Sequence, residues 1–347
     1  MKAIVKHRLF WPVVALLALI VINTIARPQF ILVTVRDGEL YGALIDILRN
    51  SAPLMLVALG MTIVIATRGI DLSVGAIMAV SGAVALTIID ASPDPGNPGT
   101  VAVALLVALA VSLVLGVWNG FLVAVVGIQP IIATLVLMLA GRGVALLITE
   151  GFITTVNSEP YEFIATGYLL ALPFAFLIWV VAVVVIALFE RRTALGMLTE
   201  AVGINPEASR LAGVRARGIV FGAYVASGLL AGIAGIIYSS NIRAADANAA
   251  GLFIELYAIL AVVLGGTSLM GGKFTIAGTV IGVLTIQTLE ATILFLGVPS
   301  AQSPVFFAIV VIVVVLVQSP RLHRWGRSAL GAARRRSHAG AGAGVTS

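Results

Sequence analysis

The sequence contains no cysteine and very little charge. Without cysteine, the chain can form no disulfide bond, no thiolate metal site and no cysteine nucleophile. Only 10% of its 347 residues are charged, whereas about 25% are charged in an ordinary soluble domain. The three histidines, His7, His323 and His338, lie near the two ends of the chain, where we interpret them as solvated residues. We therefore expect no catalytic residue, no metal site and no cofactor.

Two motifs of catalytic proteins are missing as well. The sequence has no GxxxxGK[ST] run, so it lacks the loop that cradles nucleotide phosphates in ATPases. It also has no HExxH run, which would place a zinc site and a general base on one helix. The first absence indicates that the chain is not an ATPase. The second, with the lack of cysteine, argues against a membrane-embedded enzyme, which is one alternative interpretation of the sequence.

Apolar residues dominate the composition and form long runs. The chain is 60% hydrophobic, its mean hydropathy is +1.13, and a helix needs about 20 apolar residues to cross a bilayer. We therefore predict an all-α integral membrane protein with about ten transmembrane helices, some of them short or broken, and with inverted repeats of the kind common in transporters. We favour an uncleaved first span over a signal peptide, because its apolar run is long for a signal core. The predicted spans are Leu9–Ala26, Ala52–Thr67, Leu72–Ile89, Val101–Val126, Ile131–Thr149, Tyr168–Phe189, Ile219–Tyr238, Phe253–Leu264, Phe274–Leu296 and Val305–Val317.

Glycines interrupt several of these runs. In a bilayer, irregular backbone is tolerated only where protein or a water-filled cavity covers it. We therefore predict tight helix packing or re-entrant turns at five glycines, namely Gly75, Gly265, Gly266, Gly271 and Gly272.

The basic residues indicate an orientation. Lysine and arginine prefer short cytoplasmic loops, which explains the net charge of +6 without a nucleic-acid partner. With both ends in the cytoplasm, the outer side keeps Arg27, Arg36, Arg49 and Arg243. The inner side then receives Lys2, Lys6, Arg8, Arg68, Arg191, Arg192, Arg210, Arg215, Arg217, Lys273 and the arginines from Arg321 to Arg336. We predict a transmembrane domain over residues 1–320 and a basic, disordered cytoplasmic tail over residues 321–347, whose arginines contact anionic membrane lipid.

One charged segment, "EAVGINPEASRLAGVRARG", separates two long apolar runs. Asn205 is a favourable N-cap and Pro206 suits the first helical position. We therefore predict a short helix over Pro206–Leu211 that ends at Gly213. An ordinary solvated loop is the alternative that the residues alone leave open.

This segment resembles the cytoplasmic coupling loop of permeases in sugar-type ABC importers, the ribose and galactoside family. Three further runs resemble that family in the expected order: "IATRGIDLSVGAIMAVSGA" at Ile65–Ala83, "GVWNGFLVAVVGIQPIIATLVLMLAGRG" at Gly116–Gly143 and "LGGTSLMGGKFTIAGTVIG" at Leu264–Gly282. The resemblance covers nearly the whole chain outside the tail. Its closest likeness is to importers of galactofuranose-like sugars. One departure is Arg68, where we expect glycine.

The resemblance implies a multi-pass subunit of the bacterial inner membrane that forms half of a sugar pathway. Its implied partners are a separate ABC ATPase, a second permease that is identical or homologous, and a periplasmic sugar-binding protein. The sequence does not name the sugar. An ion-coupled secondary transporter is the alternative function. The implied ATPase-coupling residues are Glu200, Gly203, Asn205, Pro206, Glu207, Arg210, Leu211 and Gly213.

Polar residues within the predicted spans are few. A charge at the bilayer centre costs at least about 2.5 kcal/mol, so we expect Arg142 and Glu290 to face protein or water. We expect Asp71 to cap the following helix and to pair with Arg68. Polar residues of this kind either line a sugar path or bond between helices, and the sequence leaves both open. The candidate path residues are Asn119, Gln129, Gln287 and Glu290.

Overall fold

A computed structural model describes residues 9–297, 305, 308 and 309 of the chain. The nine predicted spans that fall within residues 9–297 each coincide with a helix, which confirms the all-α membrane fold. The last predicted span, Val305–Val317, and the predicted boundary at residue 320 lie outside the described residues apart from three positions. The matching helices are α2 (Phe10–Ala26), α4 (Ala52–Ala66), α5 (Val74–Asp90), α6 (Pro98–Gly120), α7 (Pro130–Ile148), α9 (Phe174–Arg192), α12 (Ala216–Ile242), α13 (Ile254–Leu264) and α14 (Ile276–Phe295).

Helix length separates full spans from broken ones. Among the described residues, 5 helices are long and apolar enough to cross a membrane, and the number is 6 if α3 (Ala43–Asn50) and α4, which meet at a 46° bend, form one span. A single turn of π-helix, η2 (Phe121–Val126), extends α6. By contrast, α13 has 11 residues and is therefore about 16 Å long, roughly half of the hydrocarbon thickness.

The chain divides into a unit of residues 1–292 and a unit of residues 293–347, and the helix bundle belongs to the first unit. Within it, α12 makes its most extensive contacts with α6, α4 and α5. Small residues allow this close approach. A Cβ placed on Gly228 of α12 would lie 2.6 Å from Gly116 Cα of α6, and Ser81 Oγ of α5 donates to the Gly232 carbonyl at 2.8 Å. Backbone therefore packs directly on backbone at the centre of the bundle.

Irregular segments interrupt the bundle where α5 and α13 begin. A side chain on Gly75 would collide with the carbonyl of Gly251, in the segment before α13. One on Gly265 would collide with the backbone of Gly278. Gly266, Gly271 and Gly272 all adopt positive φ angles. The predicted roles of these glycines in tight packing and turns are confirmed.

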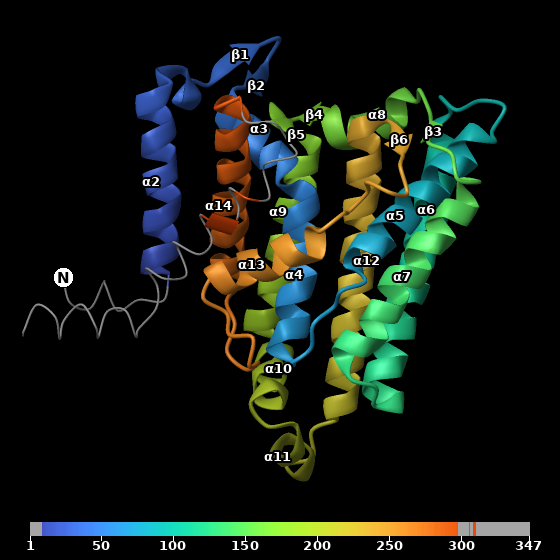
Figure 1. Ribbon diagram of the computed structural model, residues 1–347, viewed down its shortest axis with the longest axis vertical. Coiled ribbons are helices and arrows are strands. Elements are labelled where there is room, and N and C mark those ends of the chain that lie inside the picture. The colour runs from blue at the N-terminus through green and yellow to red at the C-terminus, as the bar shows by residue number, and fades with distance from the viewer. Residues whose placement is uncertain (1–8, 298–304, 306–307, 310–347) are drawn as a thin grey trace, which may run out of the picture. The chain divides into compact units, whose positions relative to one another are not determined.

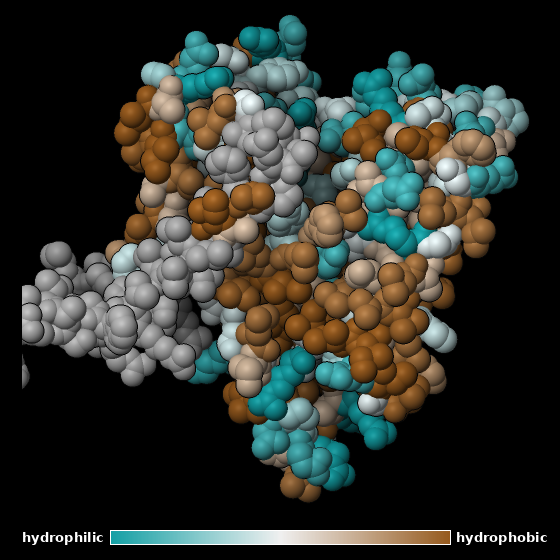
Figure 2. Space-filling view, in the orientation of Figure 1, coloured by the Kyte–Doolittle hydropathy of each residue, from teal (hydrophilic) through white to brown (hydrophobic). Residues whose placement is uncertain are grey.

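The two ends of the bundle differ (Figure 1). One end carries η1 (Pro28–Ile31), α3, α8 (Glu159–Thr166) and three antiparallel pairs of short strands, and the opposite end carries α10 (Ala194–Ile204) and α11 (Pro206–Leu211). In the view of Figure 2, apolar residues cover the middle of the helices and hydrophilic residues gather near the two ends. This distribution fits a membrane-spanning unit. The strand pairs are β1 (Thr34–Arg36) with β2 (Glu39–Tyr41), β3 (Thr154–Thr155) with β6 (Ala244–Ala245), and β4 (Tyr168–Leu169) with β5 (Leu172–Pro173).

One sequence prediction needs correction at these ends. The span predicted from Tyr168 begins too early, because the β4–β5 hairpin turns through Leu170 and Ala171, both with positive φ, before α9 starts at Phe174. The residues before Asn205, which the resemblance places in a cytoplasmic coupling loop, form the helix α10. In both cases apolar composition alone does not separate a span from a short helix or a hairpin.

Candidate coupling helix and interior polar network

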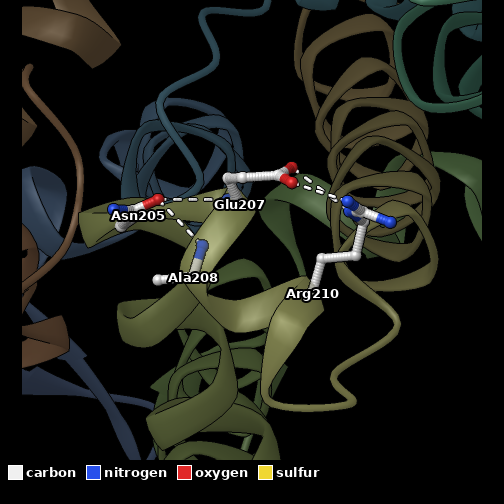
Figure 3. A network of polar contacts seen from close by, with 4 residues as sticks. All are labelled: Asn205, Glu207, Ala208 and Arg210. Carbon is white, nitrogen blue, oxygen red and sulfur yellow. Dashed lines mark hydrogen bonds and ion pairs between the residues drawn. The ribbon is translucent and has the colours of Figure 1, made fainter.

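The N-terminus of α11 is capped as its sequence predicts. Asn205 Oδ1 accepts hydrogen bonds from the backbone N–H groups of Glu207 at 3.1 Å and Ala208 at 3.0 Å (Figure 3). Pro206 occupies the first helical position, where no hydrogen-bonding N–H is needed. The predicted bounds, Pro206–Leu211, are confirmed.

The C-terminus of α11 is closed by a glycine. Gly213 has a φ of +86°, a conformation that other residues adopt only with strain. The Gly213 N–H donates to the Arg210 carbonyl at 3.0 Å, and the Val214 N–H donates to the Ser209 carbonyl at 2.9 Å. These two bonds form a Schellman motif. Six residues thus form a helix that is capped at both ends.

The charges of α11 pair with each other. Arg210 Nη2 lies 2.6 Å from Glu207 Oε1, and Arg210 Nε donates to Glu207 Oε2 at 3.2 Å. The hydrogen bonds and charge of Arg210 lower the pKa of Glu207, so this carboxylate is ionised at neutral pH. Both side chains are 66% exposed, and Leu211 is 77% exposed. The helix therefore presents a small surface with a balanced charge and one apolar side chain.

The helix before α11 is anchored on the bundle. Gly203, near the end of α10, is buried, and a side chain there would collide with the Ala66 carbonyl at the end of α4. That carbonyl accepts a hydrogen bond from the Gly272 N–H at 2.9 Å. Glu200 lies one turn earlier and is only partly exposed. The predicted coupling residues thus lie together on α10 and α11, with Gly203 at the anchored side and Leu211 at the exposed side.

Inside the bundle, a polar network surrounds Asp71. This residue is fully buried. Its Oδ1 accepts hydrogen bonds from the Ser73 N–H at 3.0 Å and the Ser73 Oγ at 2.6 Å, and its Oδ2 accepts one from Ser227 Oγ at 2.8 Å. Asn119 Nδ2 donates to Ser73 Oγ at 2.7 Å. The network joins the segment before α5 to α6 and α12.

The network corrects one sequence-based prediction and adds a structural contact to a second residue. Asp71 does not pair with Arg68, whose guanidinium instead donates to backbone carbonyls. Asn119, predicted as a path residue, is fully buried and bonds between helices. Nothing in the sequence singles out Ser73 or Ser227, because a serine inside an apolar run carries no signal of what it contacts.

Arg142 faces protein, as its charge requires. Its Nη1 donates to the carbonyls of Ala247 at 2.9 Å, Asn248 at 3.4 Å and Ala250 at 2.6 Å. These carbonyls belong to the irregular segment between β6 and α13. Arg142 therefore links α7 to the segment that precedes the short helix α13.

The other predicted path residues lie in two places. Gln129 is exposed at the turn between η2 and α7. On α14, Gln287 is buried and its Nε2 donates to Glu290 Oε2 at 2.9 Å, while Glu290 is exposed. Within the described part of the chain, no hydrogen bond joins Gln129 to this pair, so the structure does not bring the four predicted residues into one cluster.

Comparison with known proteins places this arrangement in a family. The family described as the permease component of branched-chain amino acid transport systems matches residues 43–315. The galactofuranose transporter permease protein YtfT of Escherichia coli is 49% identical over 91% of this chain and 92% of its own length. The fructose import permease protein FruF of Bifidobacterium longum is 44% identical over 93% and 90%, respectively.

The ribose import permease protein RbsC of Escherichia coli is 38% identical over 89% of this chain and 92% of its own length. No solved structure matches the chain significantly. The family is one of transport permeases rather than enzymes. The chain therefore belongs to the permease family of ABC import systems, as a multi-pass sugar permease of the bacterial inner membrane.

Proposed function

We propose that the chain forms half of the translocation pathway of an ATP-driven sugar importer and couples to a separate ATPase subunit through α10 and α11. The observation that carries this proposal is the geometry of α11, an exposed helix capped at both ends and joined to α10, which is anchored on the end of α4. A rigid projection of this kind can transmit the movement of a docked ATPase into the bundle. Arg191, Arg192, Arg215 and Arg217 near α10 and α11 support a cytoplasmic position.

Two further partners complete the proposal. A second permease, identical or homologous, forms the other half of the pathway, and a periplasmic binding protein delivers the sugar. The three relatives are named for galactofuranose, fructose and ribose. Since each of these sugars is a monosaccharide, we propose that the cargo of this chain is also a monosaccharide. Asn119, Gln129, Gln287 and Glu290 stay candidates for contact with the path, and Asn119 also belongs to the interior network.

The absence of cysteine allows a direct test of orientation. Leu211 of α11 is 77% exposed and Leu170 of the β4–β5 hairpin is 84% exposed. The helix α11 and the β4–β5 hairpin lie at opposite ends of the bundle (Figure 1). In intact spheroplasts, a membrane-impermeant maleimide should label Leu170→Cys at once and Leu211→Cys only after the membrane is permeabilised. The reverse pattern would overturn the cytoplasmic position of α11.

A pair of glycines tests the role of α11 in coupling. Neither Gly213 nor Gly218 has a neighbour that an added Cβ would crowd, but only Gly213 has a positive φ. Alanine at Gly213 therefore strains the cap of α11, whereas alanine at Gly218 is compatible with helix α12. In membranes that hold the complete importer, Gly213→Ala should lower sugar uptake severalfold per ATP hydrolysed, with normal insertion.

The control, Gly218→Ala, should leave both rates unchanged. Uptake is measured with radiolabelled galactofuranose, fructose and ribose, and hydrolysis by phosphate release. If Gly213→Ala transports with the wild-type yield per ATP, α11 is not the coupling element.

A further inference from the structure

Arg68 combines a strained backbone with two long-range contacts. Its φ is +66°, in the left-handed region that residues other than glycine rarely occupy. It lies directly after α4, where Thr67 is the C-cap. A strained residue persists when surrounding interactions hold it in place. The contacts of the Arg68 side chain identify those interactions.

The guanidinium reaches two separate segments. Nη2 donates to the Ile204 carbonyl at 2.5 Å, at the junction of α10 and α11, and Nε donates to the Met270 carbonyl at 3.1 Å. A Cβ on Gly271 would collide with Arg68 Cγ, so the side chain also packs closely on that turn. One residue thus joins the end of α4, the coupling helices and the turn of Ser268–Gly272, which leads toward α14.

Arg68 also lies close to the interior network in sequence. Asp71 follows three residues later and is held by Ser73 and Ser227 inside the bundle. The short segment between Arg68 and Asp71 therefore connects the Ile204 carbonyl to α5 and α12 through a continuous series of bonds. Coupling between distant sites needs physical contacts of this type.

We propose that Arg68 is a positioning residue that holds α11 and the Ser268–Gly272 turn as one rigid unit with α4, and so transmits displacement of α11 to the interior segment at Asp71. This inference rests on the proposed coupling function of α11. The inference explains why an exposed, charged side chain follows α4, although the packing of α4 does not depend on it.

Arg68→Gly tests the proposal without adding strain, because glycine adopts a positive φ freely. In the complete importer reconstituted with its ATPase and binding protein, the ratio of sugar imported to ATP hydrolysed should fall about fivefold, a change expected of a residue that modulates coupling without contacting either ligand. Lysine has a single ammonium group instead of the several N–H donors of a guanidinium. Arg68→Lys should therefore give a ratio between those of the wild type and Arg68→Gly. The probes are radiolabelled galactofuranose, fructose and ribose.

Arg217→Ala is the matched control. Arg217 is exposed in the first turn of α12, and its side chain makes no hydrogen bond or ion pair within residues 9–297. Its replacement removes one cytoplasmic charge and should leave the ratio unchanged. An unchanged ratio in Arg68→Gly would overturn the proposal.

A second measurement reports on rigidity directly. Leu211 and Met270 are 77% and 78% exposed, so spin labels on Leu211→Cys and Met270→Cys can be placed in the chain, which has no other cysteine. The label-to-label distance distribution should broaden in Arg68→Gly and stay narrow in Arg217→Ala. A distribution that stays narrow in Arg68→Gly would also overturn the proposal, even if transport falls. Crosslinking of Leu211→Cys to the ATPase distinguishes the coupling role of α11 from the positioning role of Arg68. If no crosslink forms, the coupling role of α11 is refuted, whatever the result for the Arg68 variants.

Discussion

Gly228→Ala should destabilise the helix bundle strongly although it adds only one carbon atom. An added Cβ would lie 2.6 Å from Gly116 Cα and 3.0 Å from the Ser112 carbonyl oxygen, both on α6. These are main-chain atoms, so no side-chain rotation relieves the overlap and α12 must move away from α6. Overpacking of this kind costs about 2 kcal/mol or more. The free energy of unfolding of the purified permease in mixed detergent micelles measures the loss.

Gly222→Ala provides the matched control on the same helix. Apart from its own helix backbone, no atom lies within 4 Å of a Cβ at Gly222, and alanine favours a helix over glycine by about 1 kcal/mol. This variant should therefore be equal to the wild type or more stable. If Gly228→Ala and Gly222→Ala have the same stability, the close crossing of α6 and α12 is not as tight as the structure shows.

Asp71→Ala should have a comparably large effect for a different reason. The Asp71 carboxyl group accepts from the Ser73 N–H, the Ser73 hydroxyl and the Ser227 hydroxyl, in a fully buried site. Each buried donor left without an acceptor costs about 1–3 kcal/mol. The free energy of unfolding should therefore fall by about 3 kcal/mol or more. Asp71→Asn keeps one oxygen acceptor, so its free energy of unfolding should lie between those of the wild type and Asp71→Ala.

Asp90→Ala is the control for the loss of an aspartate. Asp90 is exposed at the end of α5, where a substitution normally changes stability by less than about 0.5 kcal/mol. Thermal unfolding of the three variants gives the comparison. Equal midpoints for Asp71→Ala and Asp90→Ala would show that the interior network contributes no stability.

The features that sequence predicts well are those with local causes. Apolar runs give the helices within a few residues, because backbone polar groups in lipid must be satisfied within a helix. The short helix α11 was predicted from Asn205, Pro206 and Gly213, since each acts on its own or neighbouring backbone groups. Their geometry in the structure agrees with these local rules.

The features that sequence misses depend on contacts between distant segments. Ser73, Asn119 and Ser227 form one network with Asp71, but they are separated by up to 154 positions, the difference between residues 73 and 227. The pairing predicted between Arg68 and Asp71 was wrong because proximity in sequence does not fix side-chain direction. The Arg68 partners lie 136 and 202 positions away. Only the fold reveals them.

The meeting of α5 and α13 inside the bundle has an electrostatic consequence. The N-terminus of a helix carries a partial positive charge of about half a unit, from its unsatisfied N–H groups. A Cβ on Gly75, in the first turn of α5, would lie 2.9 Å from Glu255 Oε2, and Glu255 belongs to the first turn of α13. Asp71 precedes α5, and its Oδ1 accepts the Ser73 N–H. Each of the two positive poles is thus accompanied by an acidic side chain from the protein itself. The partial positive charge at the start of each helix is therefore opposed by a carboxyl group of the same chain.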